Sequence, residues 1–362
     1  MTVTTSYPGV YIEEDSSTTI SVMHLATAVP VFIVSDDSAL FVKSGADIIK
    51  VVSWLDYRTQ VLAITGNDVN FEDNMVDVNT RAYFECGGST CYFVTCSNAV
   101  TVIPEHDDIT IVVSDDPSYN DVANQLCYSG SGLFAILDGP KDKVTSDYVP
   151  SDSYSANSCA AIYYPYLHTD WTSHNISSAV IMAGIFCQSD RTRGVWKSPA
   201  NIVIPAGYKP NYKPTETLQG IFNSGLAINM IRYQRDRGLC VMGARTLEDS
   251  DQWRYISVRR LFDSVEHDIK SMMNTLMFEM NTPPTWSKVK NAIVNYLHGL
   301  WKQGALMGSS EQDAFFVQIG KDITMSDDDI NQGKMIAKVG LAAVRPAEFI
   351  IITFSQNVVS LL

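Results

Sequence analysis

The chain has 362 residues, of which 46% are hydrophobic and 18% are charged. This composition is typical of a folded protein with a substantial core, and it excludes an intrinsically disordered chain. The formal net charge of −14 argues against a nucleic-acid partner and against attachment to anionic lipid, because both require a basic surface.

The sequence contains no recognisable leader and no stretch long enough to span a membrane. The opening MTVTTSYPGVYIEEDSS lacks the basic and apolar regions of a secretory signal. The longest apolar runs, such as FIIITF at 349–354, have only the length of a strand. The seven cysteines form no CxxC pair and are expected to be reduced, packed thiols. We therefore expect a soluble protein that does not insert into a membrane.

Both ends of the chain are predicted to be extended arms. Near the N-terminus, β-forming residues flank a Pro-Gly turn at 8–9, and an acidic, serine-containing linker follows at 13–17. Near the C-terminus, an Arg-Pro pair at 345–346 ends the preceding helix, and 349–354 form a short, uncharged strand. A terminal strand either joins the sheet of its own chain or adds to a sheet of a neighbouring molecule.

Between the arms, predicted strands alternate with predicted helices. Strands are expected at 29–34, 109–113, 133–137 and 159–164. Helices are expected at 47–62, 118–128 and 176–186. The segment 83–94 has two aromatic-rich runs around Gly87 and Gly88, which predicts a β-hairpin. The alternation indicates an α/β layered domain with a largely buried sheet.

The second half of the chain is predicted to be more helical. Long helices are expected at 258–280 and 286–303, separated by Pro283 and Pro284. A third helix is predicted to start at the N-cap Ser326, to carry three aspartates in its first turn and to continue to 339. Strands are expected at 239–242 and 315–319.

These elements predict an α/β (α+β) fold, with a layered α/β body, mixed sheets and terminal β-arms. We divide the chain into an N-terminal arm and linker at 1–22 and an α/β domain at 23–190. A more helical α/β domain follows at 191–345, and the C-terminal arm occupies 346–362.

The sequence carries no recognisable catalytic, metal or cofactor site. It contains no GxSxG, HExxH or Walker motif. The GxGxxA match at 130–135 opens a predicted strand, whereas a dinucleotide-binding motif must open a helix. His168, Asp170 and His174 fit no zinc-binding spacing. We therefore expect neither an enzyme nor a cofactor, with a soluble α/β enzyme of unrecognised active site as the alternative.

One stretch reverses the acidic character of the chain. Residues 280–310 contain no Asp or Glu, but they contain Lys288, Lys290, His298 and Lys302. Such a stretch forms either an ordinary solvated helix face or a complementary surface for an acidic partner.

Nine short segments between residue 7 and residue 349 match, in the same order, the sequence motifs of one known protein family. They are YPGVYIEE at 7–14, RAYFECGGSTCYFV at 81–94, FAILDGP at 134–140, DRTRGVWKSPAN at 190–201, GARTL at 243–247, YISVRRL at 255–261, QGAL at 303–306, AFFV at 314–317 and VRPAEF at 344–349. In these segments the chain resembles the contractile tail sheath proteins of phages, R-type bacteriocins and extracellular contractile injection particles. It departs from the family pattern at Cys86, Leu133 and Met242, where Asn, Arg and Trp are usual.

The resemblance implies a structural sheath subunit, one that stacks as hexameric rings around an inner tube and contracts to drive the tube through a target membrane. It further implies contacts with other copies of the chain, the inner tube protein, baseplate and terminal cap proteins, and in some particles with sheath paralogues. Such a protein is assembled in the bacterial cytoplasm and becomes part of a virion or an extracellular phage tail-like particle. An inner tube protein and a carbohydrate-binding component of the same particle are rival structural assignments.

The resemblance also assigns roles to individual residues. The inter-subunit arms would consist of Tyr7, Pro8, Gly9, Val10, Tyr11, Ile12, Phe349, Ile350, Ile351, Ile352 and Phe354. The hinges that let the bodies rotate while the arms stay paired would lie at Glu13, Glu14, Asp15, Arg345 and Pro346. Because contacts between charges release more easily than a dry apolar interface, we expect the tube-facing residues to be Lys288, Lys290, His298 and Lys302.

Overall fold

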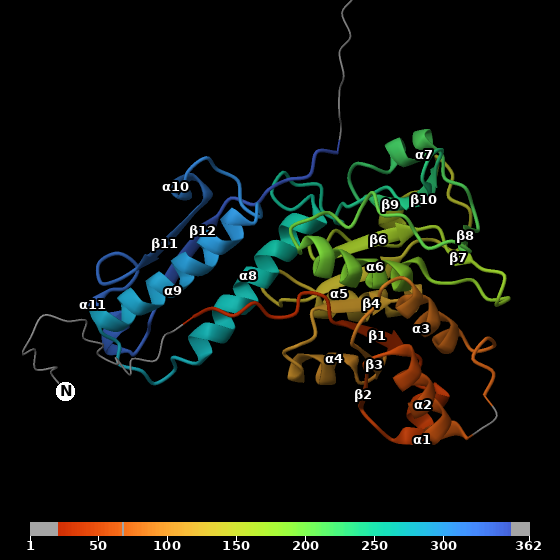
Figure 1. Ribbon diagram of the computed structural model, residues 1–362, viewed down its shortest axis with the longest axis horizontal. Coiled ribbons are helices and arrows are strands. Elements are labelled where there is room, and N and C mark those ends of the chain that lie inside the picture. Colours follow the sequence, from red (N-terminus) through yellow and green to blue (C-terminus); the bar gives the residue numbers. More distant parts are fainter. Residues whose placement is uncertain (1–20, 67–68, 349–362) are drawn as a thin grey trace, which may run out of the picture.

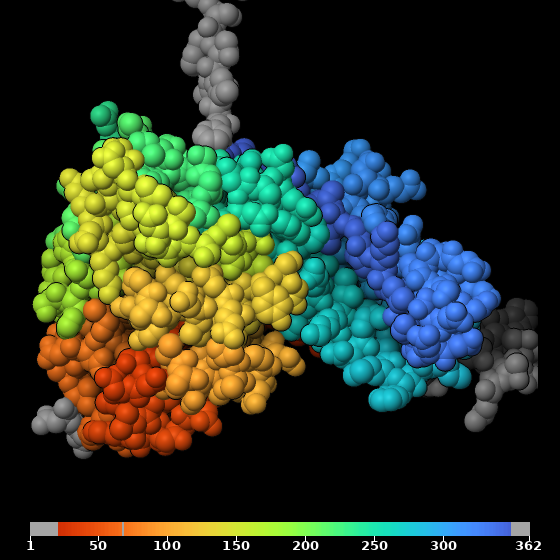
Figure 2. Space-filling model, turned by 180° about the vertical axis from the view of Figure 1, so that it is seen from behind, coloured from red at the N-terminus to blue at the C-terminus, as the bar shows by residue number. Residues whose placement is uncertain are grey.

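A computed structural model of the chain describes residues 21–66 and 69–348. These residues form an α/β body and an elongated, mostly helical lobe. The long helix α8 runs from the body into the lobe (Figure 1). In the space-filling view the lobe projects from one side of the body (Figure 2). No helix in the described ranges is long and apolar enough to cross a membrane. The predicted arms at 1–20 and from 349 onward lie outside the described residues.

The body is built on an eight-stranded mixed sheet with the strand order β10-β9-β6-β5-β4-β1-β3-β2. Six strands, from β9 to β3 in this order, are parallel, and the two edge strands are antiparallel to their neighbours. The strands are β1 (Pro30–Val34), β2 (Ile48–Val51), β3 (Cys91–Thr95), β4 (Ile111–Ser114), β5 (Phe134–Asp138), β6 (Ala160–Tyr164), β9 (Ile228–Gln234) and β10 (Gly238–Val241). This mixed sheet confirms the predicted α/β body.

Helices cover both faces of the sheet, so strand residues are buried on both sides. In β1, Phe32 and Val34 point into one apolar core, while Val31 and Ile33 point into the other. The first core includes α1 (Ala39–Ser44), α2 (Trp54–Thr65), α3 (Met75–Glu85) and α6 (Ser178–Arg193). The second includes α4 (Ala99–Val102), α5 (Asn120–Leu126) and α7 (Glu216–Ile221). Short connections complete the body: 3-10 turns at Ile103–Glu105, Pro117–Tyr119 and Pro150–Asp152, and the strand pair β7 (Leu167–His168) and β8 (Lys209–Pro210).

The lobe has a separate apolar core between helices and a small sheet. Its elements are α8 (Ile256–Asn274), α9 (Pro283–Lys302), α10 (Glu311–Ala314), β11 (Phe315–Ile319), α11 (Asp327–Asn331) and β12 (Ala337–Leu341). α8 buries Leu261 and Val265, and α9 buries Val289 and Ile293, each pair at the four-residue spacing of one helix face. β11 and β12 pair antiparallel over their whole length.

Most predicted elements are confirmed, but several are corrected. The hairpin predicted at 83–94 is wrong, because Val78, Ala82 and Tyr83 form the buried face of α3 and only the second run is a strand. Gly87, with φ of 98°, follows the end of that helix instead of turning between two strands.

The other corrections concern helix boundaries. The helix predicted at 258–280 ends at Asn274, and Pro283 and Pro284 form the first turn of α9 instead of lying between the two helices. The helix predicted at 47–62 begins only at Trp54, since Ile49 and Val51 alternate with outward-facing residues and form β2. The helix predicted to run from Ser326 to 339 ends at Asn331. Ser326 does cap it as expected, but Gly333 adopts φ of 74° and the chain then continues into the strand β12.

The division of the chain at residue 190 stays a prediction. β9 and β10, which follow that position, complete the sheet of the body, and the lobe begins with α8.

Candidate functional site

The residues assigned to the arms, and the N-terminal hinge at Glu13, Glu14 and Asp15, lie outside the described residues. The C-terminal hinge is described: Arg345 is exposed and Pro346 is half-buried in an irregular segment after β12. The structure therefore describes the residues that adjoin the two predicted arms. We call them the N-terminal root, residues 22–28, and the C-terminal root, residues 344–348.

The N-terminal root is tied to the lobe by the buried carboxylate of Asp268 in α8. Asp268 Oδ1 accepts a hydrogen bond from the backbone N–H of Leu25 at 3.0 Å, and Oδ2 accepts one from the Tyr296 hydroxyl at 2.6 Å. The His24 ring lies against the Tyr296 ring in a tilted arrangement, with a centroid distance of 4.9 Å. Burial raises the pKa of Asp268, while the hydrogen bonds from Tyr296 and Leu25 oppose the rise. One side chain thus joins the root to both long helices of the lobe.

The same root is tied to the body by a buried ion pair. Arg260 in α8 and Asp190 in α6 approach to 2.7 Å, and both side chains are only 5% exposed. Arg260 also donates to the Thr27 carbonyl at 2.8 Å, and the Thr27 hydroxyl donates to Asp190 at 2.6 Å. The guanidinium lies over the Phe186 ring, 4.8 Å from its centroid. Because both ions have hydrogen-bonding partners, their burial is compensated, but removing one would leave the other uncompensated.

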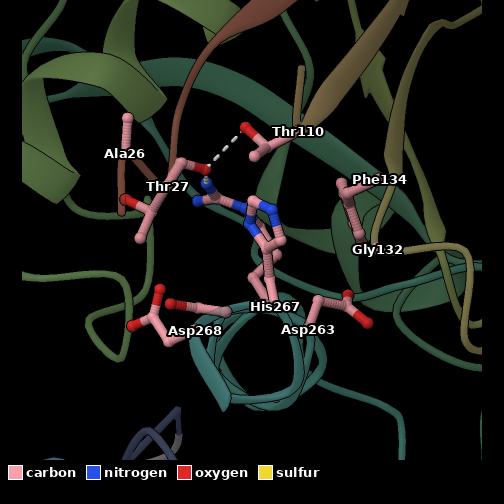
Figure 3. Close-up of a pocket in the computed structure, with 10 residues that line it drawn as sticks. Ala26, Thr27, Thr110, Gly132, Phe134, Asp263, His267 and Asp268 are labelled. Carbon is pink, nitrogen blue, oxygen red and sulfur yellow. Dashed lines mark hydrogen bonds between the residues drawn. The ribbon is translucent and has the colours of Figure 1, made fainter. Parts of the chain in front are cut away.

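A small cavity lies at this junction (Figure 3). His267 projects from α8 into the space between Thr27 and Thr110 on one side and Gly132 and Phe134 on the other. The cavity has a volume of about 20 Å³, which leaves room for about one water molecule and excludes an organic ligand. It is therefore a packing feature of the root and not a substrate site.

A second buried ion pair lies beside the cavity, within α8. Arg259 donates to Asp263 Oδ1 at 3.0 Å, and its guanidinium lies 4.2 Å from the centroid of the Trp253 ring. Burial raises the pKa of Asp263 to about 6, although the pairing with Arg259 opposes the rise. The buried residues of α8 therefore include two arginines and two aspartates, each with a charged or hydrogen-bonding partner.

The C-terminal root is tied to the body by Glu348. Arg245 donates to both carboxylate oxygens of Glu348, from Nε at 3.0 Å and from Nη2 at 2.6 Å. Asn223 and Tyr255 donate to the same carboxylate at 3.3 Å and 3.4 Å. The backbone N–H of Arg245 in turn donates to Asn229 in β9 at 2.8 Å. The root is therefore connected through Arg245 to the main sheet.

The contacts at the two roots involve residues that lie in the matched sequence motifs but for which no role was predicted. Asp190 opens the DRTRGVW segment, Arg245 lies in GARTL, and Glu348 lies in VRPAEF. Tyr255 and Arg260 belong to YISVRRL. These residues could have been suspected because each motif places charged side chains among apolar ones. A charged residue in such a segment is seldom buried without a partner.

The residues predicted to face the tube occupy one exposed face of α9. Lys288, Lys290 and Lys302 are exposed, while His298 is partly buried and lies 3.7 Å from Glu311. The opposite face is apolar and packs into the core of the lobe. Within the described ranges, the three lysines make no ion pair. The helix therefore presents unneutralised positive charge to its surroundings.

His168, Asp170 and His174, whose spacing does not fit a zinc site, each contact a different partner. His168 Nδ1 lies 3.0 Å from Asn211, Asp170 pairs with Lys209, and His174 lies 2.9 Å from the Asp73 carbonyl. Over residues 21–66 and 69–348, no three His, Cys, Asp or Glu side chains gather in a way that could hold a metal ion.

Sequence comparison relates the chain to tail sheath proteins. The family described as "Phage tail sheath C-terminal domain" matches residues 248–357. The "Putative prophage major tail sheath protein" of Pseudomonas aeruginosa (strain UCBPP-PA14) is 27% identical over 173 residues. That alignment covers 46% of this chain and 42% of the relative, so it spans less than half of that protein.

Solved structures extend the similarity to nearly the whole chain. One is the PVC sheath complex of an extracellular contractile injection system in the contracted state, with 49% identity, 99% coverage of both chains and a TM-score of 0.87. Another is the helical sheath of the anti-feeding prophage in the contracted state, with 39% identity, coverage of 98% and 100%, and a TM-score of 0.79. A third, from the six-fold symmetrised baseplate of the anti-feeding prophage, is also 39% identical, with a TM-score of 0.78.

Proposed function

This chain belongs to the contractile tail sheath family, and from that premise we propose that it polymerises as stacked hexameric rings around an inner tube and contracts to drive the tube through a target membrane. The observation that carries the proposal is the 49% identity, over 99% of both chains, with a sheath subunit of an extracellular contractile injection system. The family is structural, so the chain is a sheath protein and not an enzyme.

Strand addition between neighbouring subunits is supported by the small sheet of the lobe. β11 and β12 pair only with each other among the described strands, so each has one edge with unpaired backbone groups. On their outer face, the half-exposed Phe316 lies over Gly340. An open two-stranded sheet is a suitable acceptor for an extended strand, because main-chain hydrogen bonds supply affinity without requiring a deep pocket. We assign β11 and β12 as the acceptors for the arms of neighbouring subunits.

The two roots explain how a force on an arm could be transmitted to the folded subunit. A force carried by an arm reaches the body through Arg260 and Asp190 at one end and through Arg245 and Glu348 at the other. The subunit can then move as one body while the arms bend at the proposed hinges, which are Glu13–Asp15 outside the N-terminal root and Arg345 and Pro346 within the C-terminal root. This separation allows rings to rotate and approach while neighbours remain linked.

The exposed basic face of α9 is our candidate contact with the inner tube. A contact between charges suits an interface that must be released, since water and salt replace it at small cost. Structures from anti-feeding prophage baseplates that are 39% and 42% identical to this chain support a further contact with a baseplate. We propose that assembly takes place in the bacterial cytoplasm and that the finished particle acts outside the cell.

The proposal is tested by negative-stain electron microscopy of the full chain and of a variant lacking residues 1–20, each alone and with the co-expressed tube protein. Hollow helical tubes from the full chain that are lost on truncation support a sheath polymer linked by its arms. Small discrete particles from the full chain even with the tube protein would contradict the proposal and reopen the enzyme alternative.

A further inference from the structure

A group of large apolar side chains is exposed at the end of the lobe far from the body. Its members lie on three segments: the loop from α8 to α9, the loop from β11 to α11, and the entry to β12 (Figure 1). Phe278 is fully exposed, and the other four are between 39% and 74% exposed. We call this group the distal rim; it consists of Met277, Phe278, Met280, Ile323 and Ile336.

Hydrogen bonds hold the three segments together. Asn281, next to Met280, donates to the Lys334 carbonyl at 2.9 Å and accepts from the Trp286 indole at 2.7 Å. The Thr324 hydroxyl, next to Ile323, donates to the Ile336 carbonyl at 2.7 Å. The rim is therefore a fixed surface of the lobe and not a set of independent loop tips.

Two of the rim loops contain a residue in the left-handed region of backbone conformation. Phe278 has φ of 71° and Asp322, next to Ile323, has φ of 59°. Two of the three non-glycine residues with positive φ in the described ranges thus lie in rim loops. For a bulky residue such as Phe this conformation is a genuine outlier, and strained residues of this kind cluster at functional sites. An exposed Phe held in a strained backbone indicates a surface that is buried by a partner.

We propose that the distal rim binds a second copy of this chain in the assembled sheath. This inference rests on the proposed function. Ser21, the first described residue, precedes Val22, which packs on the core of the lobe, so the N-terminal arm leaves the subunit from the lobe that carries the rim. An arm of 20 residues that joins a neighbour keeps that neighbour within reach of the same lobe.

Two further properties favour a sheath neighbour over other occupants. An apolar contact is costly to expose again, so it suits an interface that persists through contraction better than a tube contact that must be released. The exposed carboxylate of Glu279 lies between Phe278 and Met280, and Asp322 precedes Ile323. Carboxylates within the rim disfavour a lipid surface, because burying them in hydrocarbon is costly.

The test is photocrosslinking from position 278 in assembled particles. A benzoylphenylalanine replaces Phe278 in the full chain, co-expressed with the tube protein, and the matched control carries it at Leu55, which is 72% exposed on α2 of the body. A crosslinked product of two sheath chains from position 278, mapped by mass spectrometry to a sheath peptide, is the expected result. A product of sheath and tube chains, or assembled sheaths without any crosslink from position 278, would overturn the proposal.

A second variant keeps the proposal testable without the photoreactive group. Phe278→Ser should reduce the yield of sedimenting sheath about tenfold, as expected for an interface hot spot, while Leu55→Ser should not. Both side chains are exposed, so the melting temperature of the unassembled subunit should not fall in either variant. If the wild-type chain formed no sheath at all, the proposed function would fail; if the Phe278→Ser variant formed sheaths normally, only the rim contact would fail.

Discussion

Arg245, which follows the edge strand β10, forms a bidentate ion pair with Glu348, the last described residue of the chain. Their side chains are 10% and 21% exposed, so the pair is shielded from solvent next to the proposed C-terminal arm. If that arm carries force between subunits as we propose, the force must break this pair before it can unravel the preceding residues.

Removing the pair should therefore weaken the C-terminal root. We expect Arg245→Ala to lower the free energy of unfolding by about 2–3 kcal/mol, because Glu348 is left largely buried without its cation. Urea denaturation of the unassembled subunit measures this loss. Arg345→Ala, at an exposed arginine three residues away, should change it by less than about 0.5 kcal/mol. Equal losses in the two variants would show that the pair has no special role.

The N-terminal root gives a stronger prediction, because both of its ions are almost fully buried. Arg260→Ala should cost about 3–5 kcal/mol, since it leaves the Asp190 carboxylate buried and removes the donor to the Thr27 carbonyl. The matched control is Arg254→Ala, which breaks an ion pair with Asp249 whose side chains are 29% and 32% exposed. That change should cost less than about 1 kcal/mol. Similar thermal midpoints for the two variants would contradict this assignment.

Asp138, at the carboxyl end of β5, should make stability depend on pH. Burial raises its pKa to about 6, although Ala179 N–H and the Ser178 hydroxyl donate to its Oδ1 at 2.8 Å. The folded protein therefore holds a proton there that the unfolded chain releases near pH 4. The resulting stabilisation is complete below about pH 4 and is lost as the pH rises through 6, by up to about 3 kcal/mol.

Asp138→Asn removes this titration while keeping the shape of the side chain. We expect the difference in unfolding free energy between the variant and the wild type to shift in favour of the variant as the pH rises from 4 to 7. Denaturation at several pH values measures this difference, in which the contribution of Asp263 cancels. Burial and the Asp138 carboxylate raise the pKa of Asp115 to about 7, so the loss of that charge lowers the pKa of Asp115 and shifts the difference in the same direction. A difference that is constant across that range would show that Asp138 does not titrate there.

The basic face of α9 predicts a dependence of tube binding on charge. Reversing Lys288, Lys290 and Lys302 to Glu should abolish sheath formation around the tube without unfolding the subunit, because all three side chains are exposed. The charge-matched control reverses three exposed lysines of the body to Glu: Lys43, Lys143 and Lys197. Extended particles that form normally with the α9 variant would exclude this face as the tube contact.

Elements whose residue pattern is strong and local could be predicted from the amino-acid sequence. The strands β1, β5 and β6 are short apolar runs, and α9 follows the helical repeat, so each could be predicted from neighbouring residues. The ordered motifs from residue 7 to residue 349 were enough to indicate the sheath family. Local reasoning failed at α3 and β12, where a glycine near a helix end was assigned to a hairpin in one case and to the interior of a helix in the other.

Which charged residues contact each other depends on the folded structure and could not be predicted from the sequence. Asp190 and Arg260 are 70 positions apart, and Arg245 and Glu348 are 103 positions apart, so no periodicity connects them. An unpaired charge in an apolar environment is costly, so each of these residues is buried together with its partner. That environment exists only once the lobe has packed against the body. The distal rim likewise depends on three segments that the fold brings together, because the exposure of Phe278 follows from its backbone conformation and not from its identity.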